Sequence, residues 1–166
     1  MESQVVKIPK QPVNLKVREV ISKVEEVVKN LPGHLKGNCY PLRHFFADGL
    51  YVRELTVPPM ILTVTKIHKY AHPAFLLKGE VSVLEEGGIR HVKAPSFFIT
   101  PAGTKRIIFH HTEVLLVTVH ATKETDVDKI EEEIIASDFD NLPIIDMEKE
   151  KGEIAAFIKK VTKEEE

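Results

Sequence analysis

The chain has 166 residues, of which 43% are hydrophobic and 29% charged, and its formal net charge at pH 7 is −2. This size and balance suit one soluble globular domain with a single buried core. No apolar run approaches the roughly 18 residues needed to span a bilayer. The N-terminal stretch has no apolar region followed by a small-residue cleavage site, so we expect no secretion signal. One cysteine, Cys39, excludes an intramolecular disulfide and a cysteine-based zinc cluster, which fits a cytoplasmic location.

The charge is unevenly distributed along the chain. Residues 1–123 contain 17 Lys and Arg against 10 Asp and Glu, whereas residues 124–166 contain 6 against 15. Such asymmetry can mark a nucleic-acid surface. However, the basic residues are scattered and no aromatic residues are interleaved with them. We therefore expect a solvated acidic C-terminal tail and no nucleic-acid partner.

The first predicted element is an amphipathic helix over residues 13–31. Its apolar residues recur at helical spacing opposite a Lys/Glu face; they are Val17, Val20, Ile21, Val24, Val27, Val28 and Leu31. Asn14 is the expected N-cap, and Pro32-Gly33 the expected end. Because valine is a mediocre helix former, the apolar stripe must pack against the rest of the chain or a second copy.

From about residue 50 the hydrophobic period changes from that of a helix to that of a strand. Eight short segments are rich in β-branched and aromatic residues: LYVRELTV, MILTVTKIH, PAFLLKG, EVSVLE, IRHVKA, SFFIT, KRIIFH and EVLLVTVHA. Glu86-Gly87-Gly88 signals a hairpin between two of them. Eight strands without intervening helices predict a mainly β protein, an antiparallel sandwich or barrel, and their number suits a jelly roll.

Helical signals return towards the C-terminus. The stretch TDVDKIEEEIIA begins with a capping sequence and carries apolar residues on one face. A last helix is expected from about Met147. The predicted organisation is an N-terminal amphipathic helix and linker over 1–43, a β-barrel over 44–122, and a C-terminal helical extension over 123–166.

The stretch KIHKYAH carries the first candidate site residues. In an extended strand Lys66 and His68 share a face, and His72 follows a short turn. Two antiparallel strands joined in this way can bring the two histidines together. Farther on, Arg106 and His110 share a face of another predicted strand. We therefore predict that His68 and His72 line a pocket at a barrel mouth.

The segment 61–110 resembles the cupin family. The first cupin motif is His-x-His, three or four residues, Glu, six residues, Gly. Counting back from Gly79 places His72 at the glutamate position. His68 then matches the second histidine and Lys66 the first.

The second cupin motif, Pro-x-Gly, two residues, His, matches PAGTKR, with Arg106 at the histidine position. Over about residues 44–130 the chain also resembles cupin-like proteins encoded in bacteriophage genomes. The shared segments are HFFADGLYVREL, KIHKYAH, APSFFITPAGTKR and VHATKETDVDKIEEE. The resemblance implies a double-stranded β-helix, which is a jelly-roll barrel, and it transfers no activity because none is established for those phage proteins.

The departures from the cupin motifs bear on metal binding. A usual cupin offers three histidines and a carboxylate, a set suited to Fe, Mn, Ni or Zn. Here Lys66 and Arg106 stand at two of those positions, and their charges oppose a bound cation. A site built on His68 and His72 would need a further protein ligand. Three histidines are candidates for that ligand: His44, His110 and His120.

The same positions also suit an anionic ligand. Lys66 and Arg106 supply positive charge, and a guanidinium binds carboxylate or phosphate in a bidentate manner. The complete predicted ligand-binding set is Lys66, His68, Tyr70, His72, Arg106 and His120. If the protein catalyses a reaction without a metal, His68 or His72 is the expected general base, with Tyr70 as a partner acid.

Three functions remain open from the sequence. The first is binding of a small, anionic molecule in the barrel, and the second is a metal-dependent cupin enzyme. The third is a structural or assembly jelly roll, such as a phage virion component, with a vestigial pocket. The protein would then lie in a host cytoplasm or a virion. We also expect a homo-oligomer, because long apolar edges invite pairing, and no membrane partner.

Overall fold

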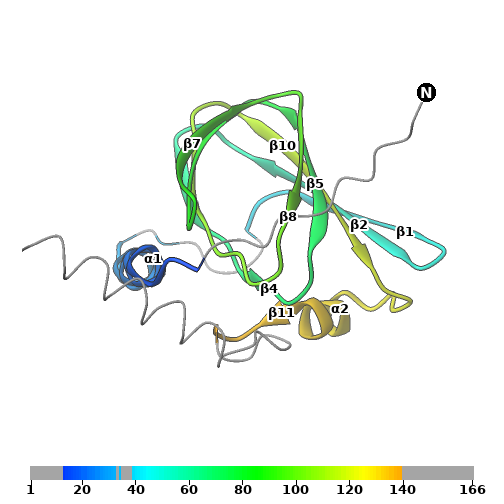
Figure 1. The fold of residues 1–166 in the computed structure, drawn as a ribbon. Helices are drawn as coiled ribbons and strands as arrows, with labels where there is room; N and C mark the ends of the chain where they lie inside the picture. The colour runs from blue at the N-terminus through cyan, green and yellow to red at the C-terminus, as the bar shows by residue number, and fades with distance from the viewer. Residues whose placement is uncertain (1–12, 33, 35–38, 140–166) are drawn as a thin grey trace, which may run out of the picture.

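The structure is a computed structural model that describes residues 13–32, 34 and 39–139. It is mainly β, as predicted, with one helix before the strands and one near their end (Figure 1). The elements in chain order are α1 Leu15–Lys29, β1 Leu42–Ala47, β2 Leu50–Val57, β3 Ile61–Val64, β4 Ile67–His68, β5 His72–Lys78, β6 Glu80–Glu85, β7 Gly88–Lys93, β8 Ser96–Thr100, β9 Ile107–His110, β10 Val114–Ala121, α2 Val127–Ile134 and β11 Ile135–Ala136.

The strands form antiparallel sheets that enclose a common interior (Figure 1). One sheet has five strands in the order β1-β2-β10-β5-β8, and a second has four in the order β3-β9-β6-β7. Strands far apart in the sequence, such as β2 and β10, are therefore neighbours. This order, with connections that cross between two sheets, is that of the predicted jelly roll. A short two-stranded sheet pairs β11 with β4.

The core lies between the two larger sheets. Its buried residues come from both: Val57, Leu76 and Val114 from the five-stranded sheet, and Val81, Val83 and Val92 from the four-stranded one. Burial alternates most clearly along β5 and β6, as the period of two in the sequence requires. The interior of the barrel is thus largely filled by aliphatic side chains.

Two strand predictions differ from the structure. The segment Leu42–Ala47 forms β1, although no strand was predicted before about residue 50. It pairs with β2 across the two-residue turn Asp48-Gly49, where Gly49 has a φ of 77°. The single strand expected over 60–68 is divided into β3 and β4. The chain leaves the ladder at Thr65, whose hydroxyl accepts a hydrogen bond from the backbone N–H of Arg106 at 2.9 Å.

Helix α1 is the predicted N-terminal helix. The side chain of Asn14 caps it by accepting a hydrogen bond from the Val17 N–H at 3.2 Å. Ile21 is fully buried, so this part of the apolar stripe packs against the body of the chain, whereas Val20, Val27 and Leu31 of the same stripe are exposed. An ion pair fixes the contact, because Arg18 Nε lies 2.6 Å from a carboxylate oxygen of Glu86, in the β6–β7 turn.

Helix α2 begins at the predicted cap, where the Asp126 carboxylate accepts from the Asp128 N–H at 3.0 Å. Ile130 and Ile134 of α2 pack against Tyr51 of β2. The helix ends next to β4 and β11 at one end of the barrel (Figure 1). The helix expected from Met147 lies outside the described residues. Among the described helices, none combines the length and apolar character that a membrane crossing requires.

Candidate functional site

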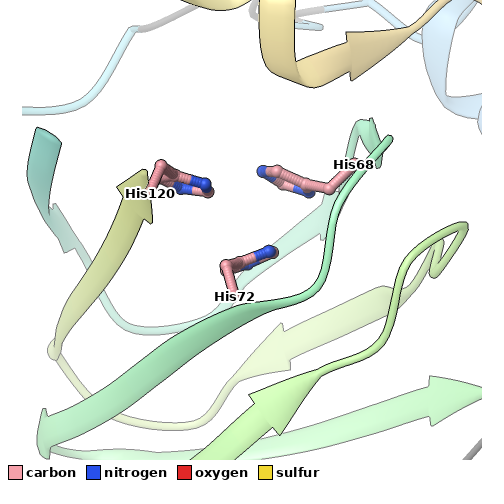
Figure 2. Close-up of side chains that lie close together, drawn as sticks. All are labelled: His68, His72 and His120. Carbon is pink, nitrogen blue, oxygen red and sulfur yellow. The ribbon is translucent and has the colours of Figure 1, made fainter. Parts of the chain in front are cut away.

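Three histidines from three strands converge at one end of the barrel. His68 ends β4, His72 begins β5 and His120 lies near the end of β10. Figure 2 shows their rings directed towards one another. The ring centroids are 4.3 Å apart for His68 and His72, 4.5 Å for His72 and His120, and 5.3 Å for His68 and His120. One potential ligand nitrogen of each ring lies within 4.8 Å of the other two.

The backbone explains why these side chains meet. His72 and His120 lie on adjacent strands of the five-stranded sheet, at inward positions of the β5–β10 ladder. His68 is held from the other side, because its backbone pairs with Ile135 of β11. Its carbonyl also accepts a hydrogen bond from the Gly103 N–H at 2.8 Å. The C-terminal extension therefore helps to position His68.

Hydrogen bonds orient two of the rings. Nδ1 of His72 lies 3.3 Å from the backbone carbonyl of Tyr70. A carbonyl only accepts, so Nδ1 carries the proton and Nε2 of the neutral ring keeps a lone pair. Nε2 of His120 lies 3.1 Å from the hydroxyl of Thr118. The His72 ring is thus oriented by the turn before β5, and the His120 ring by a residue of its own strand, β10.

Burial keeps the three imidazoles neutral. Loss of solvation lowers the pKa of His68 to about 2, that of His72 to about 4 and that of His120 to about 3. Neighbouring positive charge adds to the effect, since Arg53 and Arg106 further lower the pKa of His68. Neutral imidazoles at physiological pH offer lone pairs to a cation. A pKa this low makes a poor general base near pH 7.

The predicted cationic pocket needs correction, because both expected cations are paired with carboxylates. Lys66 forms an ion pair with Glu131 of α2, and its side chain is 47% exposed. Arg106 is buried, with Nε 2.5 Å from a carboxylate oxygen of Glu85 and a guanidinium N–H donated to the Thr100 hydroxyl at 3.0 Å. Neither side chain offers an unpaired charge to a ligand.

The barrel interior beside Arg106 is also too small for a ligand. The cavity there has a volume of only about 30 Å³ and is lined by aliphatic side chains of both sheets, together with Arg90 and Phe98. Small-molecule sites usually have roughly 300–1,000 Å³. The predicted pocket is therefore not in the middle of the barrel.

A larger cavity, of about 320 Å³, lies beside the histidines. It is lined by Tyr70, Ala71, His120, Ala121, Glu133 and Ile134. This volume is within the range of small-molecule sites. Because His68 and His72 are in ring contact with His120, the histidine cluster adjoins this cavity.

The structure distinguishes among the three candidates for a third ligand. His120 is in the cluster. His44 is not, because its Nδ1 hydrogen bonds to the Tyr51 hydroxyl at 2.8 Å, and the Tyr51 ring stands between it and His120. His110 hydrogen bonds through Nδ1 to the Ile61 carbonyl at 3.0 Å, in the β3–β9 ladder.

The sequence interpretation missed the residues that α2 contributes. Glu133 lines the cavity and accepts a hydrogen bond from the Thr122 hydroxyl at 2.7 Å. Ile134 lines it too, on the same short helix. No local motif marks these residues, since α2 reaches the cavity only through the packing of the C-terminal extension on the barrel.

No protein-family model matches the chain, and neither does any curated protein. Several solved structures resemble it. Ectoine synthase from P. lautus is 13% identical, with 73% of this chain and 90% of that chain covered and a TM-score of 0.49. A cupin 2 conserved barrel domain protein from Salinispora arenicola is 12% identical, with 58% and 87% covered and a TM-score of 0.43. The cupin domain of Schizosaccharomyces pombe Cnp3 is 18% identical, with 55% and 64% covered and a TM-score of 0.42.

Cupin-type proteins are thus among the solved structures that this chain resembles. At these identities the likeness describes a fold and says nothing of a ligand or a reaction.

Proposed function

We propose that this chain is a cupin-fold protein whose His68, His72 and His120 hold a divalent transition-metal ion, next to a cavity that takes a small ligand. The observation that carries the proposal is the approach of three neutral imidazole nitrogens to within 4.8 Å of one another. Nitrogens that share a metal at about 2.0–2.1 Å lie roughly 3.3 Å apart. Small side-chain rotations would close the difference.

The donor set fits such an ion. Three imidazoles hold zinc in open catalytic sites, and imidazole also suits Fe, Ni and Cu. The Tyr70 carbonyl supports this role, because it accepts a hydrogen bond from the Nδ1–H of His72, and such a bond fixes the orientation of a histidine that binds a metal through its other nitrogen. When bound, the ion would supply positive charge and positions for oxygen atoms of a ligand. This assignment follows the metal-dependent alternative among the three functions predicted from the sequence.

The ligand that we propose is a small molecule with an anionic oxygen, such as a carboxylate. A bound dication would make the site electropositive, and this charge, not that of Arg106, which is paired with Glu85, would attract the anion. Glu133 and the exposed ring of Tyr70 line the same cavity and could hydrogen bond to neutral polar groups of the ligand. The proposal keeps the anionic ligand predicted from the sequence, but it gives Lys66 no part in binding that ligand.

Metal analysis tests the proposal. The full chain would be purified without a metal-affinity column, and its Zn, Fe, Mn and Ni content measured before and after titration with each ion. We expect about one ion per chain, and a loss of about tenfold or more in affinity for His120→Ala. His91→Ala is the matched control, because its side chain is 52% exposed on the other sheet. The proposal would be overturned if the wild-type chain bound none of these ions, or if His120→Ala bound them with the same affinity as the wild type.

A further inference from the structure

The cavity beside the histidines has a negatively charged lining. Among the described residues that line it, Glu133 is the one with a charged side chain. The other lining residues carry no charge at neutral pH: Tyr70, Ala71, His120, Ala121 and Ile134. Arg53, whose positive charge acts on His120, is not among the lining residues.

Glu133 is held close to His120 by the backbone of β10. The Glu133 carboxylate accepts a hydrogen bond from the Thr122 hydroxyl at 2.7 Å. Thr122 continues the ladder with β2, because its backbone N–H donates to the Gly49 carbonyl at 3.1 Å. His120 and Thr122 are buried and Ala121 between them is exposed, so the first two share a face. Residues two apart on an extended strand are separated by about 6.6 Å. The carboxylate is therefore fixed near the histidine cluster.

The charge of Glu133 is not neutralised within the described part of the chain. Thr122, which is neutral, is its hydrogen-bond partner there, and no ion pair joins it to a cation. Lys66 and Lys69 contact α2, but Lys66 pairs with Glu131 and Lys69 donates to a backbone carbonyl. Glu133 is also exposed, so a ligand that enters the cavity can reach it.

This unpaired carboxylate restricts which anions suit the cavity. A ligand that carries only negative charge would be repelled by Glu133 at close range. A ligand with an ammonium group at its other end would instead be attracted, because an ammonium group donates strong hydrogen bonds to a carboxylate. Glu133 can accept from neutral donors as well, but only a cationic donor neutralises its charge.

We infer that the ligand is a small amino acid whose carboxylate lies at the metal ion and whose ammonium group donates to Glu133. The inference rests on the proposed function, because the ion provides the position for the ligand carboxylate. Glu133 determines specificity and is not itself a metal ligand, in keeping with its absence from the described group of potential ligands, His68, His72 and His120. The cavity, of about 320 Å³, has room for such a molecule.

Isothermal titration calorimetry of the full chain loaded with Zn²⁺ tests this inference. Glycine, β-alanine and 4-aminobutyrate would be compared with the acids that lack the amine, which are acetate, propionate and butyrate. We expect at least one amino acid to bind about tenfold or more tightly than its matching acid, because it makes hydrogen bonds between charged groups.

Two variants locate the origin of this preference. Glu133→Gln keeps an acceptor for the Thr122 hydroxyl but loses the charge, so it should bind both kinds of ligand equally and Zn²⁺ as tightly as the wild type. Glu132→Gln is the matched control, because Glu132 is an exposed neighbour on the same helix that does not line the cavity. It should keep the wild-type preference.

The outcomes separate this inference from the proposed function. A wild-type chain that binds no metal ion would overturn both. A chain that binds the ion but shows no preference for an amino acid would overturn the inference alone. A preference that survives Glu133→Gln would mean that the amine binds elsewhere, and weaker Zn²⁺ binding by Glu133→Gln would make Glu133 a metal ligand. Either of these results would also overturn the inference.

Discussion

His68 and His120 lie with their rings nearly parallel, at an interplanar angle of 9° and a centroid distance of 5.3 Å. They come from β4 and β10, which belong to different sheets. Protonation of either ring would place a positive charge against the other imidazole and near Arg53. The cluster therefore favours three neutral rings, and a neutral imidazole is the protonation state that can act as a metal ligand.

The first prediction concerns pH and the metal-free protein. The folded-state pKa values of His68, His72 and His120 lie below the ordinary value of 6.5, so the unfolded chain binds more protons than the folded one between about pH 4 and 6.5. Stability is then fully present above pH 6.5 and falls as the pH drops. We expect a loss of about 1–2 kcal/mol for each histidine between pH 7 and pH 5.

Urea denaturation in EDTA at the two pH values measures this loss. Carboxylates with lowered pKa, such as Glu25, titrate below 4.5 and contribute little in this window. His120→Asn removes one titrating group and should show a smaller difference between pH 7 and pH 5. Equal stability at both pH values in the wild type would contradict the buried neutral cluster.

A second prediction concerns Lys66. The side chains of Lys66 and Glu131 are 47% and 42% exposed. Exposed ion pairs contribute less than about 1 kcal/mol to the free energy of unfolding. Lys66→Ala should therefore leave both the denaturation midpoint and the metal content close to those of the wild type. If Lys66→Ala folds but loses metal or ligand binding, Lys66 takes part in the site, as expected from the sequence.

A third prediction concerns the docking of α1. Glu86 is 5% exposed and accepts hydrogen bonds from Arg18 and from the backbone N–H of Asn14. Glu86→Ala leaves the Arg18 charge without its partner, so we expect a loss of about 3 kcal/mol in the free energy of unfolding. Glu19→Ala is the control, because the Glu19–Lys23 pair on the same helix is exposed. Similar midpoints for the two variants in urea would mean that Glu86 does not anchor the helix.

A fourth prediction concerns the junction between β5 and β6. Gly79 has a φ of 92°, and a Cβ there would overlap the Glu113 carbonyl oxygen and lie 2.9 Å from a methyl carbon of Val114. Gly79→Ala should cost about 2–4 kcal/mol, from backbone strain and overlap together. Gly88→Ala separates the two causes, since Gly88 has a φ of 106° with open space around it. It should cost only about 1 kcal/mol in the same denaturation experiment.

Much of the fold could be predicted because its helix caps and turns depend on residues that are close together in the sequence. The cap at Asn14 and the Glu86-Gly87 hairpin depend on neighbours in the sequence, and both are present. Strand β1 was missed, although its Asp48-Gly49 turn is a strong hairpin signal.

The site could be predicted only in part. The spacing to Gly79 identified His68 and His72, which do meet. It could not select His120 over the other candidates, because that choice depends on how β10 aligns with β5. Lys66 was assigned to the face of His68 by assuming one continuous strand. The chain instead leaves the ladder between β3 and β4, and α2 then supplies Glu131 as a partner for Lys66.

We propose that His68, His72 and His120 bind one metal ion. Anomalous X-ray diffraction from crystals of the metal-loaded chain, collected at the absorption edge of the ion, would locate that ion. We predict one strong peak about 2.1 Å from a nitrogen of each of the three histidines. A peak at other residues, or no peak near these three after loading, would show that the three histidines do not share a metal ion.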